Sequence, residues 1–244
     1  MLGKLLVISG LSAAGKGTIA KELINRHDDF VLSISATTRE KRGNEIDGKD
    51  YFFVTKDEFE DMIKNGELIE YACYVNNFYG TPKKYVEDEL KSGKNVILEI
   101  EMQGALQIKK IYKDAVLIFF IPKDAKTQRE RLISRKRESL EQIEERIKQA
   151  IFDAEYAKHY DYIIVNDDIE KAVKDVEDVV NDANDDDRFV EEVMEKPVSQ
   201  WNGEEIRRYA SIKGIDLTGV RTTKQARSAV IAYNNEVERK ASIG

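Results

Sequence analysis

The chain has 244 residues, of which 35% are charged, and it carries a net charge of −7. This length accommodates one α/β domain with a sizeable core plus a small second module. The absence of a long apolar run argues against a membrane span, and the single cysteine, Cys73, excludes an internal disulfide framework and fits a reducing, cytoplasmic compartment.

The first predicted elements are a buried strand at Leu5–Ile8, a glycine-rich turn, and a helix that includes Ile19–Ile24. The strand begins so soon after Met1 that we expect no signal peptide. The turn has the spacing G-x-x-x-x-G-K, and its position between strand and helix favours a phosphate-binding loop over an ordinary turn. The predicted loop consists of Gly10, Leu11, Ser12, Ala13, Ala14, Gly15, Lys16, Gly17 and Thr18.

The expected ligand of this loop is a polyphosphate. Its glycines let backbone N–H groups face the phosphate oxygens, and the positive end of the following helix faces the same oxygens. Lys16 is expected to contact the β- and γ-phosphates. Gly17 stands where a Ser or Thr usually holds Mg²⁺, so Thr18 is the nearest candidate hydroxyl for that metal, directly or through water. The variant G-K-G-T resembles the loop of adenylate and cytidylate kinases.

Strands and helices alternate along the chain up to about residue 168. Further strands are predicted at residues 31–35, 51–54, 67–71, 95–100, 116–121 and 162–165. Helices are predicted at residues 56–63 after a capping box, at residues 82–91 with Thr81 as the cap, and after a capping box at Ser139. The last of these has an apolar face made of Ile143, Ile147, Ala150, Ile151 and Ala154. The alternation predicts an α/β fold with a parallel sheet covered by helices.

A second motif lies between the predicted strands at 31–35 and 51–54. Arg39 and Arg42 are three residues apart and are followed by Tyr51. Arginine side chains bind phosphate oxygens in pairs, and a phenol adds one donor. These residues therefore predict a clamp for a second phosphate, with a solvated basic turn as the alternative.

The pattern S-x-T-T-R-x-x-R-x-x-E-x-x-G-x-x-Y, from Ser35 to Tyr51, is followed by Glu70 and by Asn77–Thr81. Together these residues resemble the GMP-binding region of the guanylate kinase family, and the similarity continues in register from the loop to residues 165–168, about three quarters of the chain. The resemblance implies a P-loop nucleoside monophosphate kinase with a parallel core sheet, a GMP-binding lobe at about 35–90 and a lid at about 125–142. It also implies Mg²⁺-dependent transfer of the γ-phosphate of ATP to GMP, and to dGMP, in purine nucleotide metabolism.

The resemblance assigns roles to individual side chains. The implied contacts to the GMP phosphate are Arg39, Arg42, Tyr51 and Tyr79, and the implied contacts to the base are Glu70, Ser35 and Thr81. The chemistry of Glu70 agrees, because a carboxylate accepts hydrogen bonds from both N1–H and the exocyclic amino group of guanine, whereas adenine would leave it unpaired. Glu99 and Glu101 stand where the family often has Asp-x-Asp, with implied roles beside Mg²⁺ or phosphate and at the ribose. Asn44 stands where the family usually has Gly.

Arginines of the implied lid are the candidate catalytic groups besides Lys16. Phosphoryl transfer requires neutralisation of charge spread over the phosphate oxygens. Arg135 and Arg146 match the family's arginines, and Arg131 and Arg137 are further candidates in the same basic stretch, although residues 129–137 also fit a solvated basic helix. Asn166 resembles an adenine-side contact.

Two other functions fit parts of the pattern. A guanylate-kinase-like binding module without catalysis would have the same fold, but such relatives have usually lost parts of the phosphate loop, which is complete here. A kinase for a ribosyl phosphate would share the donor site, but a sugar phosphate has no purine edge for Glu70 to bind. The loop and Glu70 therefore favour an ATP:GMP phosphotransferase over both alternatives.

The C-terminal part differs from the rest in charge. Residues 198–244 carry +3 and residues 1–197 carry −10, and the acidic run 181–187 is expected to stay solvated at the join. We therefore expect a kinase-like domain at 1–187, a linker at 188–197 and a module at 198–244. Predicted helices at 203–210 and 223–233 flank an extended segment, as in modules of the SAP and LEM type.

The core expected for this module consists of Trp201, Ile206, Tyr209, Ala210, Leu217, Val220, Ala226, Val230 and Ile231. The cations that would meet a phosphate backbone are Lys213, Arg221, Lys224 and Arg227. Weak, salt-sensitive binding of DNA or RNA is one hypothesis for the module, and a protein-docking role or a merely appended module are the alternatives.

Overall fold

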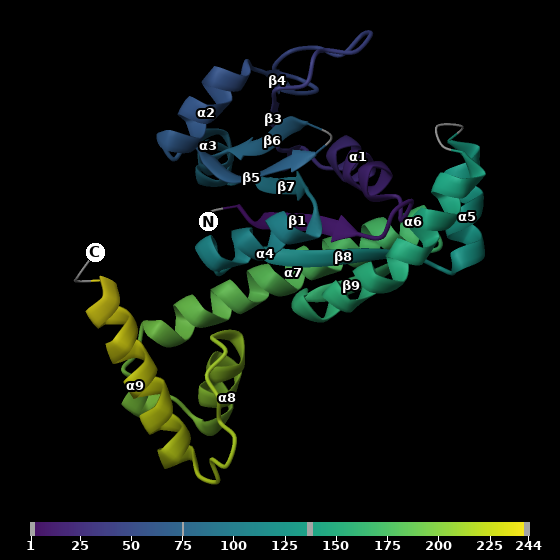
Figure 1. Cartoon of the computed structure of the whole chain (residues 1–244). Coiled ribbons are helices and arrows are strands. Elements are labelled where there is room, and N and C mark those ends of the chain that lie inside the picture. The colour runs from purple at the N-terminus through teal and green to yellow at the C-terminus, as the bar shows by residue number, and fades with distance from the viewer. Residues whose placement is uncertain (1–2, 75, 136–138, 242–244) are drawn as a thin grey trace. The chain divides into compact units, whose positions relative to one another are not determined.

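The computed structural model describes residues 3–74, 76–135 and 139–241, which form two compact units (Figure 1). The first comprises residues 1–177 and the second residues 178–244. Every helix within the described ranges is either too short or too polar to cross a membrane.

A five-stranded parallel sheet is the centre of the first unit. Its strands, in spatial order, are β2 (Phe30–Leu32), β7 (Asn95–Glu99), β1 (Leu5–Gly10), β8 (Val116–Pro122) and β9 (Tyr162–Asn166). In the centre of the sheet, Val7 is in register with Leu98 on one side and with Leu117 on the other. The predicted parallel sheet is confirmed.

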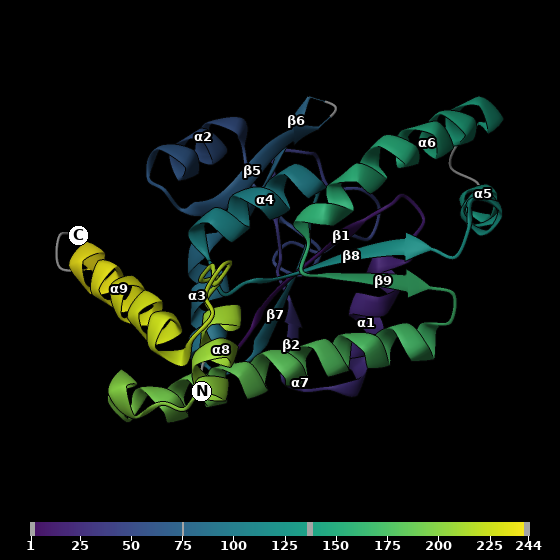
Figure 2. The same ribbon diagram turned by 90° about the horizontal axis from the view of Figure 1, so that it is seen from below.

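Helices cover both faces of this sheet, as Figure 2 shows. On one face lie α3 (Lys83–Lys91), α4 (Met102–Ile111), the end of α6 (Leu140–Asp153) and η1 (Ala154–His159), which pack on Val7, Leu98 and Phe119. On the other lie α1 (Lys16–Arg26) and the first part of α7 (Ile169–Met194). Because both faces are covered, β1, β7 and β8 are continuous apolar runs instead of alternating ones.

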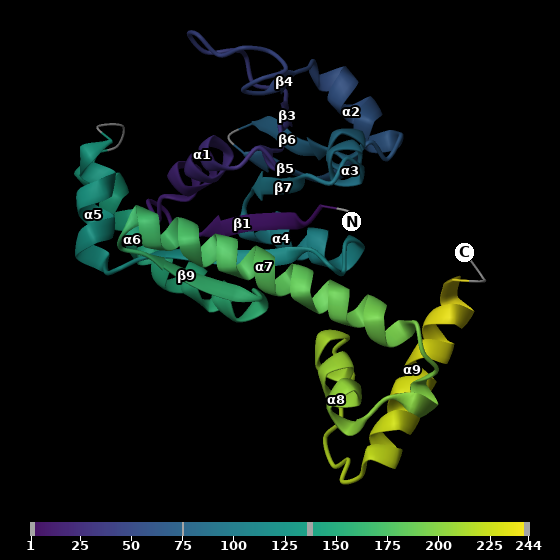
Figure 3. The same cartoon turned by 180° about the vertical axis from the view of Figure 1, so that it is seen from behind.

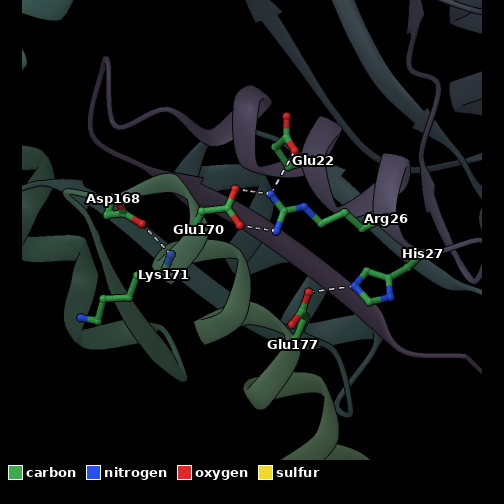
Figure 4. Close-up of polar contacts among 7 residues, drawn as sticks. All are labelled: Glu22, Arg26, His27, Asp168, Glu170, Lys171 and Glu177. Atoms are coloured by element: carbon green, nitrogen blue, oxygen red, sulfur yellow. Dashed lines mark hydrogen bonds and ion pairs between the residues drawn. The ribbon is translucent and has the colours of Figure 1, made fainter.

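Polar contacts fasten the C-terminal end of α1 to the first part of α7 (Figure 4). The Arg26 guanidinium donates to both carboxylate oxygens of Glu170, at 2.8 and 2.6 Å. Two turns further along α7, the Glu177 carboxylate lies 2.8 Å from the His27 ring. The start of α7 is capped by Asp168, whose carboxylate accepts from the Lys171 N–H at 2.9 Å. These contacts hold the C-terminal end of α1, the helix that follows the phosphate loop.

A second, four-stranded sheet forms the lobe. Its order is β4 (Phe52–Phe53), β3 (Ala36–Thr37), β6 (Asn77–Pro82) and β5 (Leu68–Tyr74), with α2 (Lys56–Lys64) beside it. The single strand predicted at 31–35 is wrong in extent, because β2 belongs to the core sheet and β3 to the lobe. Strand β6 was not predicted from the sequence; it pairs antiparallel with β5, the strand just before it in the chain.

The sequence predicts Thr81 as the cap of α3, and this prediction is wrong. Thr81 is the fifth residue of β6, and the helix begins after Pro82, whose side chain makes no capping bond. The Thr81 hydroxyl donates instead to the Glu70 carboxylate at 2.7 Å. The hydroxyl of an N-cap residue accepts from a backbone N–H, whereas Thr81 lies in the strand before the helix and its hydroxyl donates to Glu70. The expected end of the helix at Lys91 is confirmed.

The residues expected to form a lid, at about 125–142, include α5 (Ala125–Ser134) and the start of α6. Figure 3 shows α5 at the end of the sheet toward which β1 runs. The capping box at Ser139 is confirmed, as is the one at Thr55. Ile143 and Ala150 are buried as predicted, but Ile151 is 71% exposed, because the buried stripe of α6 is narrower than its apolar pattern.

The second unit contains the end of α7, η2 (Val198–Gln200), α8 (Gly203–Ile212) and α9 (Thr223–Ala241). Most of the predicted core is buried around Trp201, but Ile231 is 41% exposed and Val193 of α7 completes the cluster. The Trp201 indole donates to the Lys196 carbonyl at 3.0 Å, and Asn202 begins α8 with a capping box.

The sequence predicts a solvated join at the acidic run 181–187, but this run is helical. It lies within α7, as do residues 188–194 of the expected linker. Apolar residues at helical spacing before and after the run, such as Val179, Val180 and Val193, are buried, and their packing outweighs the modest helix propensity of Asn and Asp. Because acidic α7 residues belong to the second unit, that unit carries ten Lys and Arg against thirteen Asp and Glu, a net −3.

Candidate active site

The phosphate loop connects β1 to α1 and requires glycine at two positions. Gly10 and Gly15 have φ angles of 137° and 87°, which disfavour other residues. A Cβ atom on Gly10 would lie 2.1 Å from the Phe120 carbonyl oxygen, and one on Gly15 would lie 2.3 Å from the Asn166 amide nitrogen. The close approach of two neighbouring strands therefore fixes the path of the loop.

Lys16 is the first residue of α1, and its side chain turns back over the loop. The ammonium group donates to the Gly10 carbonyl at 3.0 Å and lies 3.3 Å from the Leu11 carbonyl. Burial lowers the pKa of Lys16, while the carboxylates of Glu99 and Glu101 oppose that shift. The cation is thus held within the loop, with acidic groups from the end of β7 nearby.

Asn166 braces the loop, and its predicted adenine-side contact stays a prediction. It is 2% exposed, and its amide nitrogen donates to the Ala14 carbonyl at 2.7 Å. Arg131 of α5 donates to the Asn166 backbone carbonyl at 3.0 Å. Gln128, also on α5, donates to the Ser12 carbonyl at 2.9 Å. This support was not predicted from the sequence, because Gln128 and Asn166 lie more than 100 residues from the loop carbonyls to which they donate.

Replacing Asn166 with alanine is expected to cost about 1–3 kcal/mol of stability, because the buried Ala14 carbonyl loses its donor. The loop would also lose its shape, so the KM for ATP should rise. Chemical denaturation and steady-state kinetics measure the two effects. Asp167→Ala, at the exposed next position, is the control, and equal effects of the two changes would contradict the bracing role.

The arginines predicted in and beside the lid differ in their hydrogen-bond partners and exposure. Arg146 of α6 donates to the Ser12 hydroxyl at 2.9 Å, so it reaches the phosphate loop. Arg135 follows the last turn of α5, is exposed, and lies close enough for its charge to act on Lys16 and Glu99. Arg131 is occupied by backbone carbonyls. Arg137 lies outside the described residues.

The predicted phosphate clamp gathers around Arg39, which is buried in the lobe. Its guanidinium carbon lies 5.3 Å from the centre of the Tyr51 ring, and the Tyr51 and Tyr79 rings are 6.1 Å apart. Burial raises the pKa of Tyr51, so its hydroxyl stays protonated as a donor. Arg42 is exposed, with its backbone in the same turn. The structure thus brings three of the four clamp residues together.

Glu45 organises this turn, a role that the motif did not reveal. Its carboxylate accepts from the Arg39 guanidinium at 2.7 Å and from the Arg42 backbone N–H at 2.8 Å. The hydrogen bond from Arg39 lowers the pKa of Glu45, and it raises the pKa of Arg39. Gly43 provides the left-handed backbone of the turn, with φ 49°, in a sequence that has Asn44 in place of the family's usual Gly.

Glu70 of β5 and Thr81 of β6 form a buried polar pair. Glu70 is 8% exposed, and one of its carboxylate oxygens accepts from the Thr81 hydroxyl. Burial raises the pKa of Glu70, and the hydrogen bond from Thr81 partly opposes the shift. Ser35 is half-buried between β2 and β3, and its carbonyl accepts from the Phe52 N–H. A carboxylate held in the lobe in this way suits a ligand edge that offers two donors.

Gly17 and Glu99 lie against each other at the end of β7. A Cβ atom on Gly17 would lie 3.1 Å from a Glu99 carboxylate oxygen, so the longer carboxylate fills the space of the usual Ser or Thr. Burial raises the pKa of Glu99, and Lys16 opposes the shift. Thr18 is exposed, and Glu101, also exposed, precedes α4 without a capping bond.

The sequence profile of the guanylate kinase family matches residues 2–183. The chain belongs to the guanylate kinase family. It is 47% identical over 178 residues to a guanylate kinase of Oceanobacillus iheyensis, covering 73% of this chain and 86% of that one. It is 46% identical over 179 residues to one of Clostridioides difficile, covering 73% and 87%.

The fold agrees with this membership. The crystal structure of guanylate kinase from Anaplasma phagocytophilum matches with a TM-score of 0.59 and 35% identity, covering 74% of this chain and 85% of that one. The guanylate kinase match ends at residue 183, before α8 and α9. The resemblance of residues 198–244 to SAP and LEM modules stays a prediction.

Proposed function

We infer that the chain transfers the γ-phosphate of ATP to GMP, giving ADP and GDP, in purine nucleotide metabolism. The observation that carries this conclusion is the combination, in a guanylate kinase family chain, of a complete phosphate loop with the buried Glu70–Thr81 pair. The loop accounts for a polyphosphate donor, and the pair accounts for guanine in the acceptor.

The arrangement of side chains suggests how transfer occurs. Loop N–H groups and Lys16 bind the phosphates of ATP, and Arg39 with Tyr51 and Tyr79 binds the phosphate of GMP. Charge that spreads over the transferred group is neutralised by Lys16 and by Arg135 and Arg146, which need no proton transfer of their own. Glu101 is assigned to the ribose.

A divalent cation, which we propose to be Mg²⁺, would neutralise phosphate charge in the bound state. Within the described ranges no cluster of three metal-binding side chains occurs. Mg²⁺ is commonly held by one or two carboxylates together with substrate phosphates. Glu99 and the Thr18 hydroxyl are the groups that would hold it, directly or through water.

A coupled assay with a panel of nucleoside monophosphates tests the function. We expect turnover of GMP and dGMP. The kcat/KM for AMP should be lower than that for GMP by roughly 100-fold or more, because an adenine ring leaves the buried Glu70 carboxylate unpaired. Ribose phosphates serve as the control for the alternative kinase. Turnover of a sugar phosphate in preference to GMP, or nucleotide binding without turnover, would overturn the proposal.

We propose that the enzyme acts in the cytoplasm, since the exposed single thiol of Cys73 suits a reducing compartment. The second unit is not needed for the chemistry as we propose it. A chain cut after residue 187 keeps the buried α7 residues up to Val180 and removes Val193 together with its partners. We therefore expect kcat and both KM values of the 1–187 chain to stay within about twofold of those of the full chain, as steady-state kinetics would show.

The same pair of chains tests a nucleic-acid partner for the second unit. Its net −3 gives no bulk attraction to DNA or RNA. Arg227, one expected phosphate contact, donates to the Trp201 carbonyl at 2.7 Å. Retention of the full chain, and not of the 1–187 chain, on a nucleic-acid resin at low salt would support that partner. Equal retention of both would favour a protein partner, and loss of turnover on truncation would contradict the separation of functions.

A further inference from the structure

Gly104 is a buried residue in the first turn of α4, and its backbone lies against the Glu70 carboxylate. A Cβ atom on Gly104 would lie 2.9 Å from Oε2 of Glu70 and 3.3 Å from the terminal methyl carbon of Ile100. The first distance is shorter than any normal carbon–oxygen packing contact. Gly104 therefore provides the space that one of the two carboxylate oxygens occupies.

The other oxygen is fixed from the opposite strand. Oε1 of Glu70 accepts from the Thr81 hydroxyl at 2.7 Å. The carboxylate is thus held between β6 and the first turn of α4. N–H groups of a first turn have no acceptor within their own helix, and the positive end of the helix dipole favours a negative charge there. This position offsets part of the cost of keeping a carboxylate in a buried site.

We propose that Gly104 is a positioning residue for guanine recognition, which acts by letting the Glu70 carboxylate lie against α4. The proposal rests on the proposed function. Two donors of guanine are read by two oxygens, so the plane of the carboxylate matters as well as its presence. A side chain at position 104 would turn that plane, because the flexible end of Glu70 moves more easily than the backbone of α4.

Gly104→Ala tests the proposal without an expected loss of fold, since alanine is the better helix former. We expect kcat/KM for GMP to fall roughly 10- to 100-fold, as misplaced binding groups produce. The ratio of kcat/KM for GMP to kcat/KM for IMP, which lacks the exocyclic amino group, should fall. The KM for ATP and the unfolding temperature should not change. Gln107→Ala, on an exposed position of the same helix, is the control.

A double-mutant cycle with Glu70→Ala separates positioning from a structural effect. Without the Glu70 side chain, Gly104→Ala has no carboxylate to displace, so it should lower kcat/KM for GMP by less than about twofold in that background. An equal loss in both backgrounds, or no loss in the unmodified background, would overturn the proposal. Failure of the unmodified chain to phosphorylate GMP would instead overturn the proposed function.

Discussion

Replacing Lys16 with alanine is expected to lower kcat/KM for the reaction of ATP with GMP by roughly 10³-fold or more, close to abolition of turnover. A preorganised donor at a developing phosphate charge contributes about 3–4 kcal/mol to the transition state, and Lys16 adds a full positive charge. The carbonyls of Gly10 and Leu11 hold its ammonium group over the loop. A water molecule that filled this space in the variant would carry no charge, so it could not replace the lysine.

The fold should survive this change. Lys16 contributes its contacts within the loop, and the core residues of α1, such as Ile19 and Leu23, are untouched. Circular dichroism and thermal unfolding of the variant should match those of Lys113→Ala, a change of an exposed lysine far along the chain. Substantial turnover by a folded Lys16→Ala chain would remove Lys16 from the donor site.

Replacing Glu70 with glutamine is expected to cost about 1–3 kcal/mol of guanine discrimination, roughly 5- to 150-fold in the ratio of GMP to other acceptors. One of two acceptor oxygens becomes an amino donor, which faces a donor on the base. The KM for ATP should move little, because the donor loop belongs to a different part of the unit. Glu67→Gln, an exposed change just before β5, is the control. A parallel rise of the ATP and GMP constants would mean that Glu70 is structural.

The same substitution should change the pH profile. Burial raises the pKa of Glu70 above that of an ordinary glutamate, and guanine needs the ionised form. Hence kcat/KM for GMP should fall as pH decreases through this raised pKa, at a higher pH than for an exposed glutamate. A raised pKa also means that ionised Glu70 disfavours folding as pH rises through that value. Glu70→Gln should therefore lose this acid limb without losing stability at neutral pH, and an unchanged limb would assign it to another group.

The order of elements explains how the residues proposed for the donor and acceptor sites are positioned. Lys16 follows β1, and Glu99 ends the neighbouring strand β7 in the parallel sheet. Parallel strands place their carboxyl ends at the same edge, so loop, carboxylates and lid arginines come together there. Glu70 and Thr81 come from the lobe sheet, and α4, which follows β7, brings Gly104 to them.

The sequence alone determined the parts of this protein whose chemistry depends on local spacing. The phosphate loop needs glycines at fixed intervals between a strand and a helix, and Arg39, Arg42 and Tyr51 of the predicted clamp lie within one short stretch. Continuous apolar runs at 95–100 and 116–121 are typical of strands with both faces buried in a parallel sheet. These features depend on neighbours in the chain, so they can be recognised before the chain is folded.

The tertiary structure decided every role that depends on a distant partner. Asn166 braces the loop because its amide reaches Ala14, 152 residues away in sequence. Thr81 binds Glu70 and does not cap a helix, since it lies in β6, where its hydroxyl is beside the buried carboxylate. Gly104 matters because α4 passes within van der Waals range of Glu70. Packing in three dimensions selects which of several hydrogen-bond partners a side chain takes, and no spacing along the chain encodes that choice.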